Sequence, residues 1–559
     1  MADPVAELRS AVEAAADALR DGQDLTGRSS ASPAERPRPR GSRLTLERPP
    51  KPEFGDYSTN AAMMLAPALG EQPRGTAEKL AAELDRSLGG SLERVEVAGP
   101  GFLNLFLADA WYRRAAGELA AQGDQLGRPE GADQLTERVN VEFVSANPTG
   151  PVTAASGRHA AYGDSVARLL EFTGHPVVRE FYVNDRGGQI EAFAKSIAAR
   201  MTGEPVPEDG YEGEYVAELA KELVEEGLGP DDLDGLARRG VSLMAESIEE
   251  TLRRYDVVFD RWSSERALHA SGAVERALEE ARQAGHVYES EGATWLRTTD
   301  FGDDKDRVLI RSEGDATYFL SDIAYHRDKL ERGADRLINV LGADHHGYPP
   351  RLRAGLAVLG CDPEVLETPI MQLVHVVEGG ERAQMSKRRG EFVTLDELIE
   401  DIGADAARFF MLQRSHDTTV DLDLELARKT SNENPVYYVQ YAHARIASIL
   451  RKAGEGAEQR AENADFKALP AEPSERALIK RLCELSDEVS EAAERRAPHR
   501  LCAYAMEAAR DFHAFYRDCQ VVGAEGEGVE QARLGLCLLT KRAIARTLGL
   551  LGISAPERM

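Results

Sequence analysis

In the first 110 residues, the spacing of apolar positions predicts helices and two strands. The stretch MADPVAELRSAVEAAADALR has apolar residues at helical spacing, and STNAAMMLAPAL predicts a second helix. VEVAGPGFLNLFL alternates apolar and polar residues on either side of a Gly-Pro-Gly turn, which indicates two strands. We therefore predict a small α+β domain at residues 1–112, followed by a Gly-rich polar linker at 113–135.

From Arg138 the pattern becomes that of a parallel α/β domain. RVNVEFVSA predicts a buried strand, and the Pro/Gly turn after it leads into GRHAAYGDSVARLLEFTG, a predicted helix. A second strand-turn-helix unit is RLINVLGADHHGYPPRLRAGLAVLG, MQLVHVV predicts a further strand, and Thr394 with Glu397 forms a predicted capping box. We predict an α/β domain at 136–415 with an acidic helical insertion at about 203–290. Helical periodicity then predicts a helix bundle at 416–559.

Composition excludes several classes of protein. The 559 residues exceed what one hydrophobic core can hold, so several domains are expected. No apolar run approaches the ~18 residues of a membrane-spanning helix, and the N-terminus lacks the basic and apolar regions of an export signal. Five cysteines without a C-x-x-C pair argue against disulfides and zinc. We expect a cytoplasmic protein with no metal site of its own and no membrane partner.

The net charge of -28 argues against indiscriminate binding to nucleic acid, because a phosphate backbone is repelled by this field. From residue 451 to the end, however, 17 Lys and Arg residues nearly balance 18 Asp and Glu residues. Two basic stretches stand out: ERPRPRGSRLTLERPPK, which contains Arg43, and the last thirty residues, which contain Arg542. Each fits either a polyanion-binding patch or a solvated linker or helix face.

Two segments have the features of a phosphate-binding site. In ANPTGPVTAASGR, residues 146–158, a strand ends in a Pro/Gly turn and leads into a helix, so free backbone N–H groups and the positive helix end face a possible anion. The later QMSKRRG contains Lys387 beside Arg388 and Arg389 in a Gly-flanked loop, which would suit a polyphosphate. Alone, each also fits an ordinary turn or a solvated charged loop.

Taken together, these segments resemble the arginyl-tRNA synthetases, a class I aminoacyl-tRNA synthetase family. The resemblance covers nearly the whole chain, in ten segments that occur in the family's order. They are KPEFGDYSTNAA, VAGPGFLNLFL, VNVEFVSANPTGP, REFYVNDRGGQI, FGDDKDRVLIRSEGDATYFLSDIAYHRDK, LGADHHGYPPR, MSKRRGEFVTLDEL, GADAARFF, NPVYYVQYAHARI and LGISAPERM.

The resemblance implies a multidomain α/β fold with three functional parts. These are an α+β domain at 1–112 that contacts the tRNA elbow, a Rossmann-type catalytic domain at 136–415 with a KMSKS-like loop at 380–392, and an all-α anticodon-binding bundle at 416–559. The implied reaction joins L-arginine and ATP, with Mg²⁺, into arginyl-adenylate, and then transfers arginine to the 3′-terminal adenosine of its tRNA. In this family the first step generally requires bound tRNA. We expect a monomer.

The resemblance also assigns residues to substrates. For arginine these are Glu142, Asn147, Tyr318, Asp322 and His345, with Asn184, Asp185 and Gln189 near the same pocket. For ATP they are Pro148, Gly150, Pro151, Thr153, Ser156, Gly157, Asp344, Met385, Ser386 and Lys387. For tRNA we expect contacts at Arg43, Arg445 and Arg542. A carboxylate such as Asp322 is the partner that a guanidinium requires, and Lys387 would steady the departing phosphates.

The chain departs from the family pattern where ATP should bind. The family's His-x-Gly-His is here Thr153-Ala-Ala-Ser156, so both imidazoles are missing, and Gln384 replaces the first lysine of KMSKS. We predict that the hydroxyls of Thr153 and Ser156 act as weaker donors, and that His159, one turn later, is structural. The alternative is a catalytically impaired paralogue that binds tRNA or regulates. Because Glu142 and Asp322 persist, the active enzyme is favoured; the acidic pocket also disfavours a synthetase for another amino acid.

Overall fold

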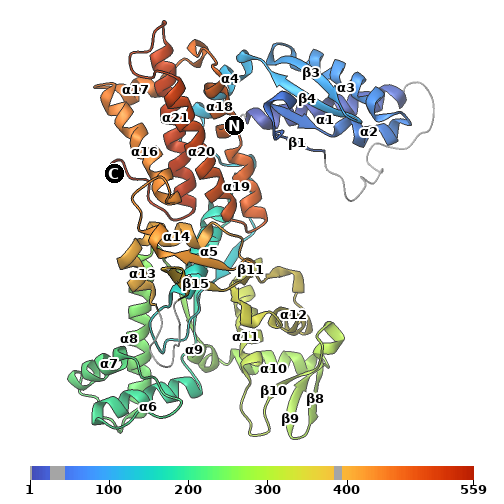
Figure 1. Ribbon diagram of the computed structural model, residues 1–559. Coiled ribbons are helices and arrows are strands. Elements are labelled where there is room, and N and C mark those ends of the chain that lie inside the picture. Colours follow the sequence, from blue (N-terminus) through green and yellow to red (C-terminus); the bar gives the residue numbers. More distant parts are fainter. Residues whose placement is uncertain (1–2, 25–43, 383–392) are drawn as a thin grey trace.

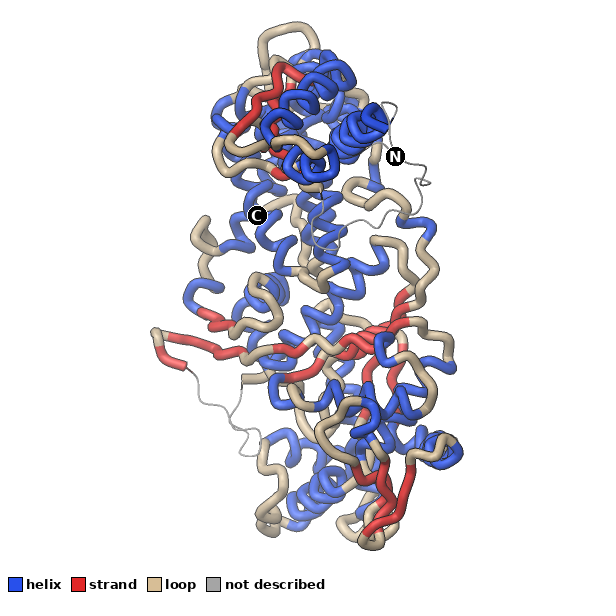
Figure 2. Tube along the Cα trace, turned by 90° about the vertical axis from the view of Figure 1, so that its right-hand side faces the viewer, coloured by secondary structure: helices blue, strands red, loops and turns tan. Residues whose placement is uncertain are grey.

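The computed structural model describes residues 3–24, 44–382 and 393–559. An N-terminal unit projects to one side from the upper end of a long helical bundle, and the bundle stands on a central sheet with further helices below it (Figure 1). Turned by 90°, the strands of the central region cross the middle of the molecule beneath the bundle (Figure 2). Among the described helices, none has the length and apolar character needed to cross a membrane.

The N-terminal unit is an antiparallel sheet covered by helices, as its sequence pattern predicts. The strands follow the order β1-β2-β4-β3, and the two on either side of the Gly-Pro-Gly turn are the longest of the four. Leu8, Leu80 and Leu103 are fully buried between the sheet and the helices. The elements are α1 (Pro4–Asp24), β1 (Leu46–Glu47), β2 (Tyr57–Thr59), α2 (Ala61–Leu69), α3 (Pro73–Leu88), β3 (Leu92–Ala98) and β4 (Phe102–Leu107).

Helix α4 (Asp109–Ala121) leads from this unit toward the bundle, and an irregular segment follows it to the central sheet. Trp111 and Tyr112 on α4 are fully buried and stack edge to face at 5.2 Å. Arg476 of the bundle forms an ion pair with Asp109 at the start of α4. The helix thus anchors the N-terminal unit on the bundle through both apolar and charged contacts.

The central sheet is parallel throughout, in the order β13-β11-β5-β6-β7, which confirms the predicted parallel α/β fold. Its strands are β5 (Val139–Glu142), β6 (Val177–Val183), β7 (Arg261–Ser264), β11 (Arg336–Asn339) and β13 (Leu366–Glu367). Strand β7 lies inside the range 203–290, where the pattern predicts only an inserted helical segment. This edge strand reads RWSS, and it is too short and polar to show the apolar run of a buried strand.

Helices and a small antiparallel sheet extend from the lower side of the central sheet (Figure 1). One group consists of α6 (Gly188–Thr202), α7 (Glu214–Glu225) and α8 (Leu233–Arg254), which share their own apolar core. The other consists of α9 (Glu265–Ala270), α10 (Ala273–Gln283), β8 (Val287–Ser290), β9 (Ala293–Leu296), β10 (Arg307–Ile310), α11 (Tyr318–Glu331) and α12 (Tyr348–Val358). Helix α5 (Ala154–Phe172) follows β5 and runs up toward the bundle.

Short strands and helices join the central sheet to the bundle. They are β12 (Leu341–Gly342), β14 (Ile370–Met371), β15 (Val374–Glu378), β16 (Glu381–Arg382), α13 (Leu395–Ile402), α14 (Ala404–Leu412), β17 (Val420–Asp423) and α15 (Leu424–Ala427). The predicted capping box is confirmed, because Thr394 Oγ1 accepts from Glu397 N at 3.0 Å and Thr394 N donates back to the Glu397 carboxylate.

The C-terminal part is helical, as predicted. Its helices are α16 (Pro435–Lys452), α17 (Ala457–Glu462), α18 (Pro473–Cys483), α19 (Leu485–Glu494), α20 (His499–Asp518) and α21 (Val529–Leu550). Helices α16, α20 and α21 bury apolar faces against one another, and four of the five cysteines are buried without disulfides. The cysteines therefore serve as small apolar core residues.

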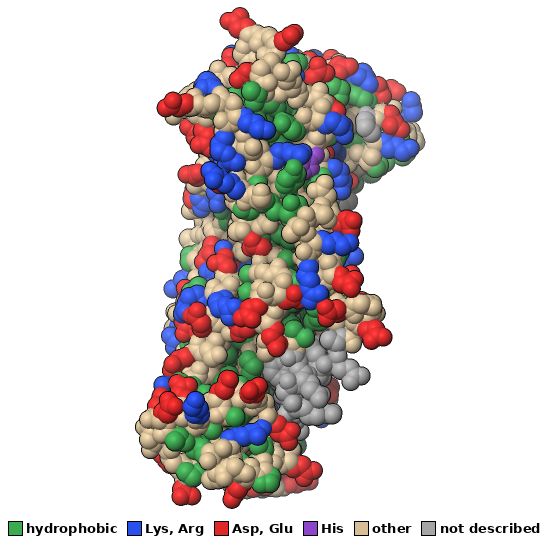
Figure 3. Space-filling view, turned by 60° about the vertical axis from the view of Figure 1, so that its left-hand side comes forward, with side chains coloured by type: hydrophobic (Ala, Val, Ile, Leu, Met, Phe, Trp, Pro, Cys, Tyr) green, Lys and Arg blue, Asp and Glu red, His purple; other side chains and the backbone are tan. Residues whose placement is uncertain are grey.

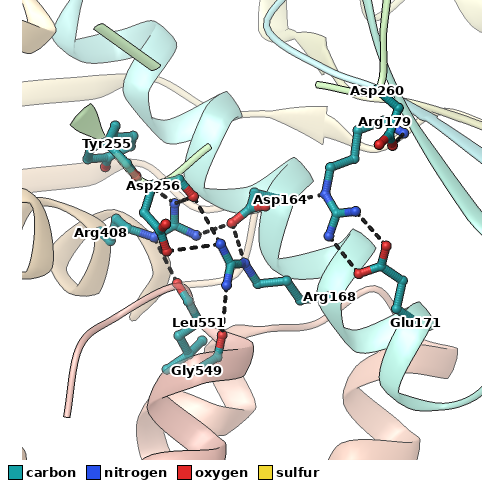
Figure 4. Close-up of polar contacts among 10 residues, drawn as sticks. All are labelled: Asp164, Arg168, Glu171, Arg179, Tyr255, Asp256, Asp260, Arg408, Gly549 and Leu551. Atoms are coloured by element: carbon teal, nitrogen blue, oxygen red, sulfur yellow. Dashed lines mark hydrogen bonds and ion pairs between the residues drawn. The ribbon is translucent and has the colours of Figure 1, made fainter. Parts of the chain in front are cut away.

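A buried arginine joins the bundle to the layers below it (Figure 4). Arg408 of α14 is fully buried and donates to the carbonyl oxygens of Leu551 and Tyr255, at 2.9 Å each. It also forms an ion pair with Asp164 of α5, which Arg168 and Arg179 approach as well. Because one guanidinium reaches three elements, α5, α8 and the end of α21 meet at a fixed point.

Candidate active site

The candidate site lies at the carboxyl edge of the central sheet, where β5, β6, β7 and β11 end. Ligands of open parallel sheets bind in the crevice at this edge. Just after β5 the chain turns sharply, since Val144 and Ser145 have positive φ angles of 66° and 38°. Such angles are rare for residues other than glycine and are strained for a β-branched valine, and strain of this kind concentrates at functional sites. The turn brings Ser145 Oγ back to Glu142 Oε1 at 3.0 Å.

Buried carboxylates gather beside this turn. Asp322, in the second turn of α11, accepts a hydrogen bond from the hydroxyl of Tyr348, and burial raises its pKa to about 7, with Glu142 and Glu265 adding to the rise. Glu265, at the start of α9, is 4% exposed, and burial raises its pKa to about 7 as well. Both carboxylates, with Glu142, also raise the pKa of Tyr182. These residues therefore form an acidic cluster, here called the acidic pocket, which is suited to a cation.

Amide side chains border the acidic pocket. Asn147 Nδ2 donates to Gln189 Oε1 at 2.7 Å. The Asn184 amide donates to Asn147 Oδ1 at 3.3 Å in one orientation and to Glu265 Oε2 at 2.6 Å in the other. Asp185 instead accepts from Ser264 Oγ at 2.6 Å and from the backbone of Arg266, so it holds the loop around β7. Asn147, Asn184 and Gln189 are thus brought together, whereas Asp185 is used structurally.

Tyr318 and His345 lie at the rim of the pocket. Tyr318 is 52% exposed, and its hydroxyl would lie 3.0 Å from a Cβ placed on Gly187. The His345 ring contacts the ring of Tyr348 edge to face, with the ring centres 6.3 Å apart. Through Tyr348, His345 is one side chain away from Asp322. Both residues border the acidic pocket on the solvent side.

The start of α5 is capped by the two hydroxyls that replace the family's imidazoles. Thr153 Oγ1 accepts from Ser156 N at 3.2 Å, and the Thr153 and Ser156 hydroxyl oxygens are 3.1 Å apart. Two hydroxyls that share one hydrogen bond retain one O–H that can donate elsewhere. The N-capping role and a donor role are therefore compatible.

The turn before α5 is fixed on both sides. Tyr215 of α7 donates to the carbonyl of Thr149 at 2.8 Å, and its hydroxyl would lie 3.0 Å from a Cβ on Gly150. Pro148 and Gly150 are buried, and Pro151 is half-buried. The insertion helices therefore shape the Pro/Gly turn directly.

The segment after residue 392 pairs with the same turn. Ala154 N donates to Val393 O at 2.9 Å, and Leu395 N donates to Val152 O at 2.8 Å. A Cβ on Gly157 would lie 2.8 Å from Leu395 Cδ1, so Gly157 permits this close approach. Residues Met385, Ser386 and Lys387, expected at the ATP phosphates, lie outside the described residues, as does Arg43. The described residues that follow Lys387 in the sequence, from Val393 on, therefore lie directly beside the start of α5.

His159 lies closer to the site than the sequence suggests. A Cβ on Gly342 would lie 3.7 Å from His159 Cε1, and Asp344 and His345 both act electrostatically on the imidazole. Burial lowers the pKa of His159 to about 4, so the ring is neutral. Among the described residues, its ring nitrogens have no hydrogen-bond partner. Whether His159 is only structural stays a prediction, and its half-buried ring lies beside Gly342 and near Asp344.

Two of the expected tRNA-binding arginines lie in the bundle. Arg445 lies over the rings of Tyr441 and Tyr516, at 4.7 and 5.6 Å from the ring centres. Tyr437 stacks on Tyr441 with ring centres 6.0 Å apart. Arg542 forms an ion pair with Glu462. Lys and Arg side chains also gather over the upper part of the molecule on the face in Figure 3.

Sequence reasoning did not identify Glu265 or Lys329, and it did not assign His159 to the site. Lys329 of α11 is fully buried and contacts Glu142 through an ion pair. The sequence around Lys329, AYHRDKLE, gives no sign that the lysine faces inward, and Glu265 follows a strand that the pattern does not predict. Across the described part of the chain, no group of three or more His, Cys, Asp or Glu residues could hold a metal ion.

Family models for three domains match the chain in succession. The model of the arginyl-tRNA synthetase N-terminal domain matches residues 7–107, and that of the class I (R) tRNA synthetase catalytic domain matches residues 121–448. The model of the DALR anticodon binding domain matches residues 439–559.

Curated relatives and solved structures agree with these matches. The chain is 44% identical over 528 residues to the arginine-tRNA ligase of Bacillus subtilis, covering 92% of this chain and 94% of the relative. It is 47% identical over 532 residues to that of Frankia alni, covering 92% and 95%. The Thermus thermophilus arginyl-tRNA synthetase structure gives a TM-score of 0.75 at 27% identity, over 99% of this chain and 100% of that one. The Plasmodium falciparum enzyme, at 17% identity and a TM-score of 0.71 over 92% and 95%, shares the fold.

Proposed function

This chain belongs to the arginyl-tRNA synthetase family and is an arginine-tRNA ligase, and we propose that the carboxyl edge of its central sheet is where arginine and ATP react. The ligase activates arginine with ATP and transfers it to the 3′ end of arginine tRNA. The observation that carries the assignment of the site is the pair of neighbouring carboxylates, half-buried Asp322 and buried Glu265, which interact with each other and whose pKa values are both raised to about 7. The relatives at 44–47% identity are ligases, which favours an active enzyme over an impaired paralogue.

Asp322 and Glu265 would bind the guanidinium of arginine. A guanidinium presents its donors in a planar fork, and a carboxylate matches that fork with two acceptors. Tyr318 would close the rim over the side chain, and His345 would support Tyr348 beside Asp322. At the other end of the substrate, Glu142 and Asn147 would hold the α-amino group, because both follow directly from the end of β5.

The start of α5 would receive the ATP phosphates. Backbone N–H groups at a helix start, with the helix dipole, stabilise an anion without further charge. The free O–H of the Thr153 and Ser156 pair would donate to a phosphate oxygen as charge develops there, with Pro148, Gly150, Pro151 and Gly157 shaping the turn. Asp344 and the neutral ring of His159 would contact the nucleoside, and Met385, Ser386 and Lys387 would act on the phosphates.

Mg²⁺ would enter with ATP, held by the phosphates as part of the substrate. The tRNA would lie along the bundle, where Arg445 and the rings of Tyr437, Tyr441 and Tyr516 offer stacking surfaces and a cation for unpaired bases. Arg542, and Arg43 in the N-terminal unit, would contact the phosphate backbone. Since one chain supplies every residue of the proposed substrate and tRNA sites, we propose a monomer that acts in the cytoplasm.

The test is arginine-dependent exchange of pyrophosphate into ATP, measured with and without arginine tRNA. The variants Asp322→Asn and Glu265→Gln keep the shape of each side chain and remove its charge. Because a hydrogen bond to a charged group contributes about 1.5–3 kcal/mol, each should raise the KM for arginine by about 10- to 100-fold. The KM for ATP should change little. An unchanged KM for arginine in both variants would place arginine elsewhere.

A further inference from the structure

We propose that Lys329 is a positioning residue for arginine. It belongs to a buried chain of hydrogen bonds that keeps the two ends of the substrate pocket at a fixed distance from each other. The chain runs from Glu142 through Lys329, Asn339 and His326 to the backbone of Asp322. The inference rests on the proposed roles of Glu142 and Asp322 in binding arginine. It assigns no contact with the substrate to Lys329 itself.

Three members of the chain lie on one face of α11. Asp322, His326 and Lys329 are four and then three residues apart, the spacing that places side chains on the same side of a helix. Lys329 is fully buried and His326 is 3% exposed. This face of α11 packs toward the carboxyl ends of β5 and β11, which present Glu142 and Asn339. The helix thus faces the site with a polar rather than an apolar stripe.

The direction of every hydrogen bond follows from Lys329. An ammonium group can only donate, so Lys329 Nζ donates to the Glu142 carboxylate and, at 3.2 Å, to Asn339 Oδ1. That fixes the Asn339 amide, whose Nδ2 donates to His326 Nε2 at 2.6 Å. His326 therefore holds its proton on Nδ1, which donates to Asp322 O at 2.7 Å. Burial lowers the pKa of His326 to about 3, in agreement with a neutral ring.

Ion pairs hold the carboxylates behind the proposed site. Lys329 pairs with Glu142, and Glu180 is approached by both Arg332 and Arg261. Lys329 and Arg332 help to hold the pKa of Glu180 below its usual value against the effect of burial. The ring of Tyr325 lies 4.4 Å from Lys329 Nζ on the remaining side. Removal of the ammonium would leave Glu142 partly buried without a counter-ion, which is unfavourable for a buried ion pair.

The hydrogen-bonded chain runs from the Glu142 carboxylate to the backbone of Asp322, and these two residues would lie at opposite ends of the proposed substrate. Glu142 would hold the α-amino group and Asp322 the guanidinium, so their separation determines which side-chain length fits. A rigid spacing selects arginine against shorter or longer cations, because a misplaced cation loses its hydrogen bonds. We therefore expect Lys329 to affect selectivity among amino acids more than it affects the use of ATP.

The experiment compares Lys329→Met with Lys429→Met in pyrophosphate exchange with saturating arginine tRNA. Lys429 is the matched control, since it also pairs with a glutamate, Glu433, but on the surface. For Lys329→Met we expect the KM for arginine to rise at least tenfold and the KM for ATP to change less than twofold. The preference for arginine over lysine and homoarginine should fall at least tenfold. The control should match the wild type.

Asn339→Leu tests the same chain without removing a charge, and it decides the question if Lys329→Met does not fold. It breaks the link to His326 and leaves the pair of Lys329 with Glu142 in place. We expect the selectivity for arginine over homoarginine to fall at least threefold. The thermal midpoint should fall below that of Lys429→Met, because His326 Nε2 and Lys329 Nζ each lose a buried partner. Equal losses for arginine and ATP, or unchanged selectivity in whichever variants fold, would overturn the inference. If Asp322→Asn also left the KM for arginine unchanged, the proposed site would be wrong instead.

Discussion

At the scale of single residues, the pocket depends on carboxylates whose charge changes near neutral pH. Burial, with Glu142 and Glu265 nearby, raises the pKa of Asp322 to about 7, and burial raises that of Glu265 to a similar value. A guanidinium binds the ionised carboxylate and is not attracted by the protonated acid. Arginine should therefore lower the pKa of these groups when it binds, and acid should weaken arginine binding in return.

The first prediction is a pH dependence of arginine binding. As the pH falls below about 7, the KM for arginine should rise by up to about tenfold per pH unit for each carboxylate that must ionise. Above pH 8 it should be constant. The measurement is pyrophosphate exchange from pH 6 to 8.5, with the KM for ATP as the internal control. Asp322→Asn should remove much of the dependence, and a flat profile in the wild type would contradict ionisation of Asp322 and Glu265 near neutral pH.

The second prediction concerns the hydroxyl pair at the start of α5. Ser156→Ala removes one hydroxyl and leaves the cap intact, because Thr153 Oγ1 still accepts from the backbone N–H of residue 156. Loss of a preorganised donor costs about 2.7–4 kcal/mol when the donor is strong, so a weaker hydroxyl should cost roughly a tenfold to hundredfold decrease in kcat. The control is Ser242→Ala, because Ser242 is an exposed residue of α8. A Ser156→Ala enzyme with full kcat would show that backbone N–H groups suffice.

At the scale of elements, helix α5 connects the proposed ATP site to the rest of the molecule. Its first turn carries Thr153 and Ser156, and its fifth residue, the buried Arg158, donates to the carbonyls of Gln372 and Ser415 at 2.8 Å each. Further along, Asp164 joins the junction around Arg408. A movement at the junction would therefore be transmitted along a rigid helix to the phosphate-binding end.

The sequence predicts elements of this kind better than it predicts their partners. The turn signals and periodicity place α5, α16 and the strands of the N-terminal unit, because those signals are local. The partners of Arg158, and Arg408 as one partner of Asp164, lie more than 200 residues away, and no local pattern identifies them. Glu265 is also not identified from the sequence, because it follows β7, a strand that the pattern does not predict. The family-like motifs supplied most of the candidate site, whereas Lys329, Asn339 and His326 required a structure.

The third prediction is that Arg408 holds the junction together. Arg408→Met should leave Asp164 buried with fewer partners and two carbonyls without a donor. Breaking a buried ion pair destabilises a protein by roughly 3–5 kcal/mol. The same change at exposed Arg428, which pairs with Asp401 and Glu378, should cost at most about 1 kcal/mol. Urea unfolding followed by circular dichroism measures both, and equal midpoints would show that the junction does not contribute to stability.

At the scale of the whole molecule, the surfaces proposed for tRNA and for arginine lie in different units. Ion pairs attach the N-terminal unit to α18 and α19, between Arg9 and Asp487, and between Lys480 and Asp56. The bundle in turn rests on α5 through Arg408 and Leu551. One chain of contacts thus runs from the N-terminal unit, through the bundle, to the start of α5. A tRNA that binds the bundle is therefore in a position to affect the site.

The fourth prediction separates tRNA binding from chemistry. Arginine-dependent exchange should require arginine tRNA, and Arg445→Ala should raise the tRNA concentration needed for half-maximal exchange by about tenfold, because base contacts of this kind contribute about 1–3 kcal/mol. At saturating tRNA the exchange rate should recover, since α16, which carries Arg445, lies in the bundle, away from α9 and α11 at the other side of the central sheet (Figure 1). Arg558→Ala, in the exposed C-terminal segment, provides the control. Full exchange without tRNA would mean that the sheet edge is already competent, and that contacts between the bundle and α5 serve stability alone.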